Sequence, residues 1–343
     1  WMPQSALAQS DSAAPPPAVV VAPVVTKEVS ASAEFIGQTE AFHSVDLRAR
    51  VRGFLTEKSF EEGHRVADGD VLFVIDPSEY EAARDAAAGQ GIAIARDNVA
   101  AATGADIVIL MLPNGEISKA VAAEVIPAMA KGALLIDCST IDVASARAVH
   151  GMAGKAGILC LDAPVSGGVG GAAAGTLTFM VGGSAEAFEK GKPVFEIMGR
   201  KAVHCGDGGA GQSAKICNNM LLGISMIGAC EAFSLAEKLG LSQQALFDVV
   251  STSSGSCWSV NTYCPVPSVG PQSPADNDYK PGFAAALMLK DLLLSQQAAG
   301  ESGAATPMGR HASELYQAMV DAGQGGTDFS GMIEFLKSGA AKG

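Results

Sequence analysis

The chain has 343 residues, which is enough for two domains and at least one sizeable buried core. Its formal net charge of -13 argues against binding to nucleic acid, because contact with the phosphates needs Lys/Arg clusters, which the sequence does not show. Hydrophobic residues make up 48% of the chain and aromatic residues only 6%, a balance common among α/β enzymes with closely packed helices.

The first part of the chain divides into two segments. Residues 1–25 are rich in Ala, Pro and Ser and have no period that could bury one face, so we expect a disordered leader. Residues 26–87 show β patterning: "SVDLRARVRGFL" alternates as a half-exposed strand does, and "VLFVID" follows an Asp68-Gly69 turn. Residues 18–86 resemble the N-terminal portion of periplasmic adaptor subunits of bacterial efflux pumps. This resemblance implies a β-rich, adaptor-like segment.

From residue 88 to residue 208 the pattern alternates between strand and helix. The expected strands are "ADIVILMLP", "ALLIDCST", "ILCLDAPVSGG", "TLTFMVGG" and "KAVHCG", with helices between them. This order predicts an open, largely parallel sheet with helices on both faces. Residues 209–343 are expected to form an all-α domain. Its helices are predicted near residues 210–240, 242–253, 282–300, 305–322 and 328–338.

Three stretches fit the glycine pattern of a pyrophosphate-binding turn, beginning at Gly89, Gly168 and Gly209. No strand precedes the first, the second leads into another strand, and no strand with a ribose-binding acid follows the third. None of the three therefore has the context that such a turn needs.

The long helix expected from residue 210 offers a different chemistry. Lys215 and Asn219 are four residues apart, so their side chains project from the same face. A solvent-facing lysine is the simpler interpretation, but polar residues at the start of an otherwise apolar helix need partners. Asn218, Asn219 and Glu231 interrupt the apolar run at 216–236, which favours a buried helix over a membrane span.

The motifs "MLPNGE", "LIDCSTID", "LDAPVSGGVGGAAAGTLTFMVGG", "GAGQSAKICNNM", "TSSGSCWSVNTY" and "LMLKDL" occur in one order from about residue 89 to the end. Together they closely resemble the 3-hydroxyisobutyrate dehydrogenases, members of the β-hydroxyacid dehydrogenase family. The resemblance implies NAD or NADP as cofactor, a small 3-hydroxyacid as substrate, a role in valine breakdown, a cytoplasmic location for this part, and a homo-oligomer. The implied fold is an incomplete Rossmann-type parallel sheet followed by an all-α domain.

The resemblance also implies roles for individual residues. Lys215 would be the catalytic lysine, and Asn219 would bind the substrate together with Ser166, Gly167 and Gly168 of "VSGG". The positions near the cofactor would be Leu112, Pro113, Thr140 and Lys290. For Leu112 the alternative is packing at a strand end, and for Lys290 it is a surface charge paired with Asp291.

The seven Cys and five His show no spacing that predicts a metal site. Five of the Cys lie in apolar runs, where we expect buried, reduced thiols: Cys138, Cys160, Cys205, Cys217 and Cys230.

The sequence departs from the family at its start, because the opening strand, G-x-G-x-x-G turn and second strand are replaced by the adaptor-like residues. The strand at "ADIVILMLP" should therefore be an unpaired edge. A chain of this kind could also be a non-catalytic interaction protein derived from either parent.

Overall fold

The computed structural model describes residues 54–67 and 69–339. These residues belong to one compact unit, which comprises Arg50–Gly343. The leader expected at residues 1–25 and most of the strand expected within 44–55 lie outside the described residues.

The first described elements form a small hairpin. Strands β1 (Leu55–Lys58) and β2 (Phe73–Ile75) pair antiparallel and make a two-stranded sheet of their own. Helix α1 (Ser78–Gly89) follows and runs across residues 87 and 88, where the sequence suggests a domain boundary. The described residues before α1 thus contribute no strand to the main sheet.

The main sheet has six strands, and its central path has the order β3-β4-β5-β7-β6, with β8 beside β7. The first three run parallel, whereas β7 runs antiparallel to β5 and parallel to β8. This reversal at β7, which also pairs antiparallel with the short β6, is not predicted by the sequence pattern. The strands are β3 (Ile107–Leu110), β4 (Leu134–Asp137), β5 (Leu159–Asp162), β6 (Val165–Ser166), β7 (Leu177–Gly183) and β8 (Gly199–Gly206).

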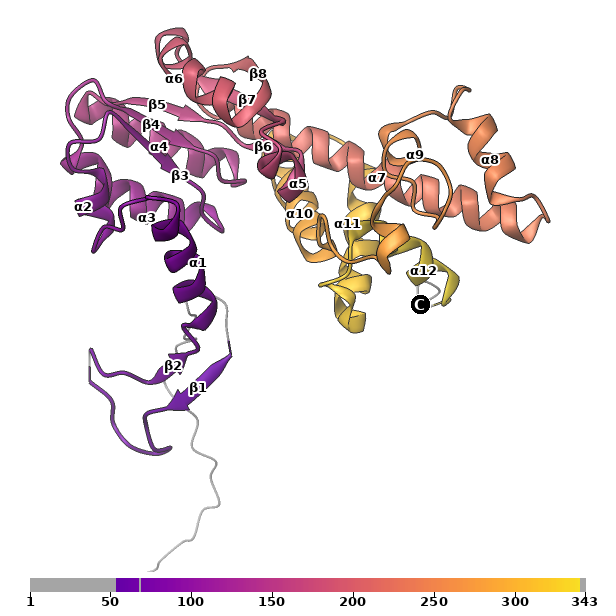
Figure 1. The fold of residues 1–343 in the computed structure, drawn as a ribbon, viewed down its shortest axis with the longest axis horizontal. Helices are drawn as coiled ribbons and strands as arrows, with labels where there is room; N and C mark the ends of the chain where they lie inside the picture. Colours follow the sequence, from indigo (N-terminus) through magenta and orange to yellow (C-terminus); the bar gives the residue numbers. More distant parts are fainter. Residues whose placement is uncertain (1–53, 68, 340–343) are drawn as a thin grey trace, which may run out of the picture. The chain divides into compact units, whose positions relative to one another are not determined.

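Helices cover both faces of this sheet (Figure 1). Because side chains alternate along a strand, Leu135 of β4 packs with the helices on one face, while Leu134 and Ile136 pack with α6 on the other. The first face carries α2 (Asn98–Ala102), α3 (Gly115–Val125) and α4 (Val143–Ala156), and the second carries α6 (Ala185–Met198). A short α5 (Gly168–Ala173) lies after β6.

Strand β3 is an edge strand, as the sequence analysis predicts. In the described part of the chain it pairs only with β4, and Ile109 and Met111 are 44% and 67% exposed. An edge of this kind presents unpaired backbone groups to solvent.

The rest of the chain is helical and is organised around α7 (Ala210–Lys238), which extends from the sheet into the helical half (Figure 1). A second hydrophobic core forms between α7 and the helices that follow it. These are α8 (Gln243–Val250), α9 (Trp258–Asn261), α10 (Ala285–Ser302), α11 (Pro307–Met319) and α12 (Met332–Lys337). Helix α7 is long and apolar enough to cross a membrane, but so are the core helices of soluble proteins, and this helix packs in the core. The α/β fold with an all-α second half is thus confirmed.

Candidate active site

Helix α7 is anchored to the sheet by a buried carboxylate at the end of β5. Asp162 is 1% exposed. Its Oδ1 accepts hydrogen bonds from Gly209 N at 2.7 Å and lies 2.9 Å from His150 Nε2, and its Oδ2 accepts from Gln212 N at 2.9 Å. Asp162 therefore satisfies two of the otherwise unpaired amides at the start of α7. The helix dipole favours a negative charge at this end of the helix.

The glycines of "GDGGAGQSA" allow this close contact between helix and sheet. A Cβ on Gly211 would lie 2.3 Å from Met180 O and 2.5 Å from Asp162 O. Gly209 has φ +89, a left-handed conformation that favours glycine. Since Asp162 already occupies the amides of Gly209 and Gln212, this stretch is a helix-packing motif and cannot also cradle a pyrophosphate. The structure thereby explains why the third glycine match carries no phosphate site.

The other two glycine matches also lack the required geometry. Gly89 is the last residue of α1, whose preceding strand β2 is outside the main sheet. Gly168 begins the six-residue α5 after the two-residue β6. In the described residues, neither stretch joins a strand of the main sheet to a helix long enough to hold a dinucleotide by its amino end.

The buried stripe of α7 begins with polar residues. Gln212, Lys215 and Asn219 are 0%, 7% and 2% exposed, and Gly223 and Met226 continue the same stripe. The spacing of three, four, four and three residues places all five on one face of the helix. The polar part of this stripe faces the junction with the sheet, and the apolar part faces the helical core.

Lys215 is buried and reaches the strand that follows Asp162. Its Nζ donates to Val165 O at 2.7 Å. Burial is the main cause that lowers the pKa of Lys215 below 10.5, the nearby Asp291 opposes that shift, and Lys290 adds to it. The neutral amine is thus more accessible at Lys215 than at an exposed lysine.

The "VSGG" loop lies directly beside Lys215, because Ser166 follows the carbonyl that accepts its hydrogen bond. Gly167 and Gly168 have φ +137 and +60, so the turn depends on glycine at both positions. A Cβ on Gly168 would come within 3.4 Å of Gly282 O, which belongs to the helical half. The loop therefore passes close to both halves of the chain.

A chain of contacts links the start of α7 to the loop after β4. Asn219, one turn from Lys215, donates through Nδ2 to Oδ2 of the buried Asp291 at 2.5 Å. Lys290 Nζ lies 3.6 Å from Asp291 Oδ1 and donates to Thr140 O at 2.9 Å. Lys290 does pair with Asp291, but the pair is part of this junction and not an isolated surface contact.

Close packing of α10 on α7 places these groups together. Gly223 stands one turn beyond Asn219, and a Cβ there would be 3.1 Å from Leu292 Cδ2. The absence of a side chain at residue 223 therefore lets α10 approach, which brings Lys290 and Asp291 to the polar start of the α7 stripe.

The loop after β3 is tied to the loop after β4. Leu112 N donates to Ser139 Oγ at 2.8 Å, and the Leu112 side chain packs on the core beneath α3 and α4, as in the strand-end interpretation. Pro113 and Thr140 stand in these two loops, at the carboxyl ends of adjacent parallel strands, where ligands bind in open α/β sheets. The predicted cofactor positions are therefore neighbours.

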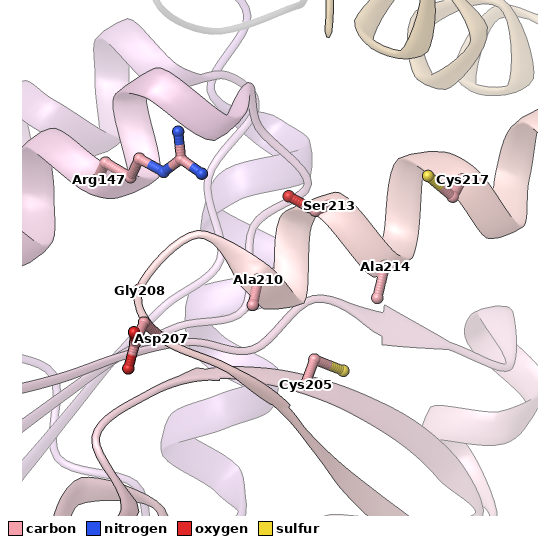
Figure 2. Close-up of a pocket in the computed structure, with 8 residues that line it drawn as sticks. All are labelled: Arg147, Cys205, Asp207, Gly208, Ala210, Ser213, Ala214 and Cys217. Carbon is pink, nitrogen blue, oxygen red and sulfur yellow. The ribbon is translucent and has the colours of Figure 1, made fainter. Parts of the chain in front are cut away.

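A pocket of about 460 Å³ opens on the other side of α7 (Figure 2). Ser213, Ala214 and Cys217 line it from the helix and Arg147 from α4, whereas Lys215 is not among its lining residues. At 100° per residue, the centre of this lining face is about 150° from Lys215. The pocket is therefore separate from the candidate active site.

The thiols differ from expectation at two positions. Cys138, Cys160 and Cys230 are buried, but Cys205 is only partly buried and Cys217 is exposed. Both line the pocket in Figure 2. All seven thiols are free, and no group of three or more potential metal ligands occurs in residues 54–67 and 69–339.

Sequence reasoning did not identify Asp162 and Gln212 as parts of this site. Both lie inside quoted motifs, and Asp162 ends a buried apolar strand, a position where a charged residue needs a partner. That signal would have marked Asp162, but it does not tell which distant amides it binds.

Known proteins are similar to this chain in sequence and in fold. A profile described as the NAD binding domain of 6-phosphogluconate dehydrogenase matches residues 63–206, and one described as NAD-binding of NADP-dependent 3-hydroxyisobutyrate dehydrogenase matches residues 209–336. The first match begins inside the segment 26–87, and the two meet at the start of α7.

The chain is 49% identical over 275 residues to a probable 3-hydroxyisobutyrate dehydrogenase of Mycobacterium tuberculosis, a match that covers 80% of this chain and 92% of the relative. It is 46% identical over 253 residues to an NAD-dependent L-serine dehydrogenase of Pseudomonas aeruginosa, covering 73% of this chain and 85% of that relative. A solved structure of Mycobacterium tuberculosis 3-hydroxyisobutyrate dehydrogenase with L-serine matches with a TM-score of 0.72 and 50% identity, covering 75% of this chain and 88% of that one.

Proposed function

The chain belongs to the 3-hydroxyisobutyrate dehydrogenase family, and we propose that it oxidises the primary alcohol of 3-hydroxyisobutyrate to methylmalonate semialdehyde with NAD or NADP. The observation that carries the proposal is a buried lysine with a lowered pKa, beside a glycine loop and a buried amide. This combination provides a base and polar groups for a small hydroxyacid at one place.

We assign the proton transfer to Lys215. Bound NAD or NADP would supply the acceptor for the hydride that leaves the carbinol carbon. The neutral Lys215 amine would accept the hydroxyl proton as the C=O bond forms, and the ammonium would return it in the reverse reaction. The lowered pKa supports this role, because it makes the neutral amine available at a lower pH than in a free lysine.

The substrate carboxylate would be held by the "VSGG" loop and Asn219. Ser166 offers a hydroxyl, and Gly167 and Gly168 offer backbone N–H groups without side chains that would obstruct the acid. Asn219 is held by Asp291, so its carboxamide is fixed in orientation before substrate arrives. These contacts would place the hydroxyl near Lys215.

The described residues fit the nicotinamide end of the cofactor better than its adenosine end. Leu112, Pro113, Thr140 and Lys290 gather at the carboxyl ends of β3 and β4, and the buried Asp291 Oδ1 there has no hydrogen bond in the described residues. In the described residues, the glycine turn from β8 into α7 has its amides at Gly209 and Gln212 already bonded to Asp162, and the one from β6 leads only into the six-residue α5.

We infer that the chain lacks the family's opening strand and glycine turn, and that the upstream residues derive from an efflux adaptor. The separate β1-β2 hairpin and the β3 edge support this inference. The family profile, however, already matches from residue 63, inside the segment 18–86 that resembles the adaptor. Loss of the pyrophosphate contacts would weaken cofactor binding by about a thousandfold, or roughly 4 kcal/mol.

The same family membership supports two further proposals, a related substrate and a homo-oligomer. L-serine is also a 3-hydroxyacid, and it stands in the names of a relative and of a solved structure. We propose a homo-oligomer that forms through the helical half. There Leu221 and Leu235 of α7 and Leu239, which directly follows it, are 65%, 60% and 75% exposed.

The free thiols support a reducing, cytoplasmic location for the dehydrogenase part.

Cofactor titration and a chimera test the proposal. NAD and NADP are titrated against the purified chain, and NAD(P)H formation at 340 nm is followed with 3-hydroxyisobutyrate and with L-serine. We expect weak but saturable cofactor binding, and ordinary turnover once residues 1–88 are replaced by a β-α-β opening from the family.

The rescue should disappear with Lys215→Ala and persist with Ser213→Ala, since Ser213 is two residues away on the other face of α7 and bonds only within the helix, to Gly209 O. A chimera that binds cofactor but oxidises neither hydroxyacid would refute the assigned activity. Monomeric behaviour in light scattering at micromolar concentration would refute the homo-oligomer.

A further inference from the structure

Gln212 connects the catalytic helix to the loop after β4. Its side-chain Nε2 donates to Ser139 O at 2.7 Å, and its Oε1 accepts from Ile141 N at 3.1 Å. Its backbone N–H is bound by Asp162. The residue is 0% exposed, so each polar atom of this buried group has a partner.

The two side-chain bonds enclose Thr140. Ser139 and Ile141 flank it in sequence, and its own carbonyl accepts from Lys290 Nζ at 2.9 Å. The loop that carries Thr140 is therefore fixed by α7 through Gln212 and by α10 through Lys290, while its link to β3 runs through the Ser139 hydroxyl.

A carboxamide suits this position better than a carboxylate or an apolar side chain. It presents a donor and an acceptor in one plane, which matches a carbonyl and an N–H two residues apart on the same loop. A glutamate would place oxygen against Ser139 O, and a methionine would leave the carbonyl of Ser139 and the amide of Ile141 unsatisfied in a buried site.

We propose that Gln212 is a positioning residue that sets the distance between the Thr140 loop and Lys215. Gln212 and Lys215 are three residues apart on one rigid helix, so a loop bonded to Gln212 is held at a fixed place relative to the Lys215 amine. This role rests on the proposed function, because Thr140 is a predicted cofactor position and Lys215 the predicted proton carrier.

Two variants and a matched control test the role in the full-length chain. Gln212→Met removes both side-chain bonds to the loop. Gln212→Glu removes the bond to Ser139 O and keeps an oxygen that can accept from Ile141 N. Gln243→Met removes a partly buried glutamine in α8 whose Nε2 contacts Phe233 O within the helical half. Circular dichroism first establishes that each variant is folded.

Hydrogen exchange gives a readout that needs no turnover. In Gln212→Met, the amide of Ile141 should exchange about tenfold faster or more, while amides in the middle of α7 keep their wild-type rates. Gln243→Met should leave the Ile141 amide unchanged. An unchanged Ile141 amide in Gln212→Met would overturn the proposal.

Ligand binding separates positioning from stability alone. We expect the Kd for NAD(P) to rise about tenfold in Gln212→Met while the apparent pKa in the pH profile of kcat, which reports Lys215, stays in place. A faster-exchanging loop with an unchanged cofactor Kd would mean that Gln212 only stabilises the fold, and would overturn the role. A wild-type chain that neither binds nor reduces cofactor would instead refute the proposed function.

Discussion

The carboxylate of Asp162 should be among the most sensitive single groups in the fold. Replacing Asp162 by Ala removes the acceptor for Gly209 N and Gln212 N and the partner of His150 Nε2. Two buried backbone donors left without acceptors cost about 1–3 kcal/mol each. We therefore expect Asp162→Ala to lower the free energy of unfolding by roughly 3–5 kcal/mol. Asp162→Asn, which keeps one oxygen in place, should lower it by about half as much.

Urea unfolding followed by circular dichroism measures this effect. Asp207→Asn is the matched control, because it removes a carboxylate from the same end of α7, but from an exposed side chain. That variant should change the free energy of unfolding by less than about 1 kcal/mol. A loss of less than about 1 kcal/mol in Asp162→Ala as well would refute the reasoning, since it would mean that the cap does not hold the helix to the sheet.

Three further outcomes are expected. Asn219→Ala should raise the KM for the hydroxyacid and lower the free energy of unfolding by about 2–4 kcal/mol, since the buried Asp291 Oδ2 loses its donor; steady-state kinetics and urea unfolding measure both. Iodoacetamide should label the exposed Cys217 well before Cys138, whose pKa burial raises to about 12, and peptide mass spectrometry reports the order. Because the folded pKa of Lys215 lies below 10.5, the unfolded chain binds more protons between these two values. The free energy of unfolding should therefore gain a contribution that rises with pH across that window, and urea unfolding at several pH values should find this contribution absent in Lys215→Met.

The fold elements could be predicted because their signals are local. Strand β3 is an apolar run, and so are β4 and β5 up to the Asp that ends each of them; β4 and β5 are largely buried, as expected for strands between two layers of helices. The shared face of Lys215 and Asn219 also follows from spacing alone. Local patterns do not report direction, so the antiparallel turn from β5 to β7 could not be seen before the strands were paired.

The polar partners of the site could not be predicted in the same way. Gln212 meets Ser139 and Ile141 across 73 and 71 residues of sequence, and its amide meets Asp162 across 50. Such contacts depend on how α7 docks on the sheet, which no short window of sequence contains.

The exposure of Cys217 has a related cause. Apolar residues occur on every side of α7, with Leu221 and Leu235 exposed and Met226 and Phe233 buried. Periodicity therefore does not mark the solvent face of this helix. Only the packing of α10 against Gly223 identifies which stripe is buried.

The rate of 3-hydroxyisobutyrate-dependent NAD(P)H formation at saturating cofactor, compared between the wild-type chain and Lys215→Met, tests the central claim most directly. We expect a substrate-dependent rate in the wild type, slowed by weak cofactor binding, and a rate lower by about a hundredfold or more in the variant, since general acid–base catalysis contributes that much. Both proteins should have the same cofactor Kd. Equal rates in the two proteins, or no substrate-dependent rate in a wild-type chain saturated with cofactor, would contradict the assignment of Lys215 as the proton carrier of a 3-hydroxyacid dehydrogenase.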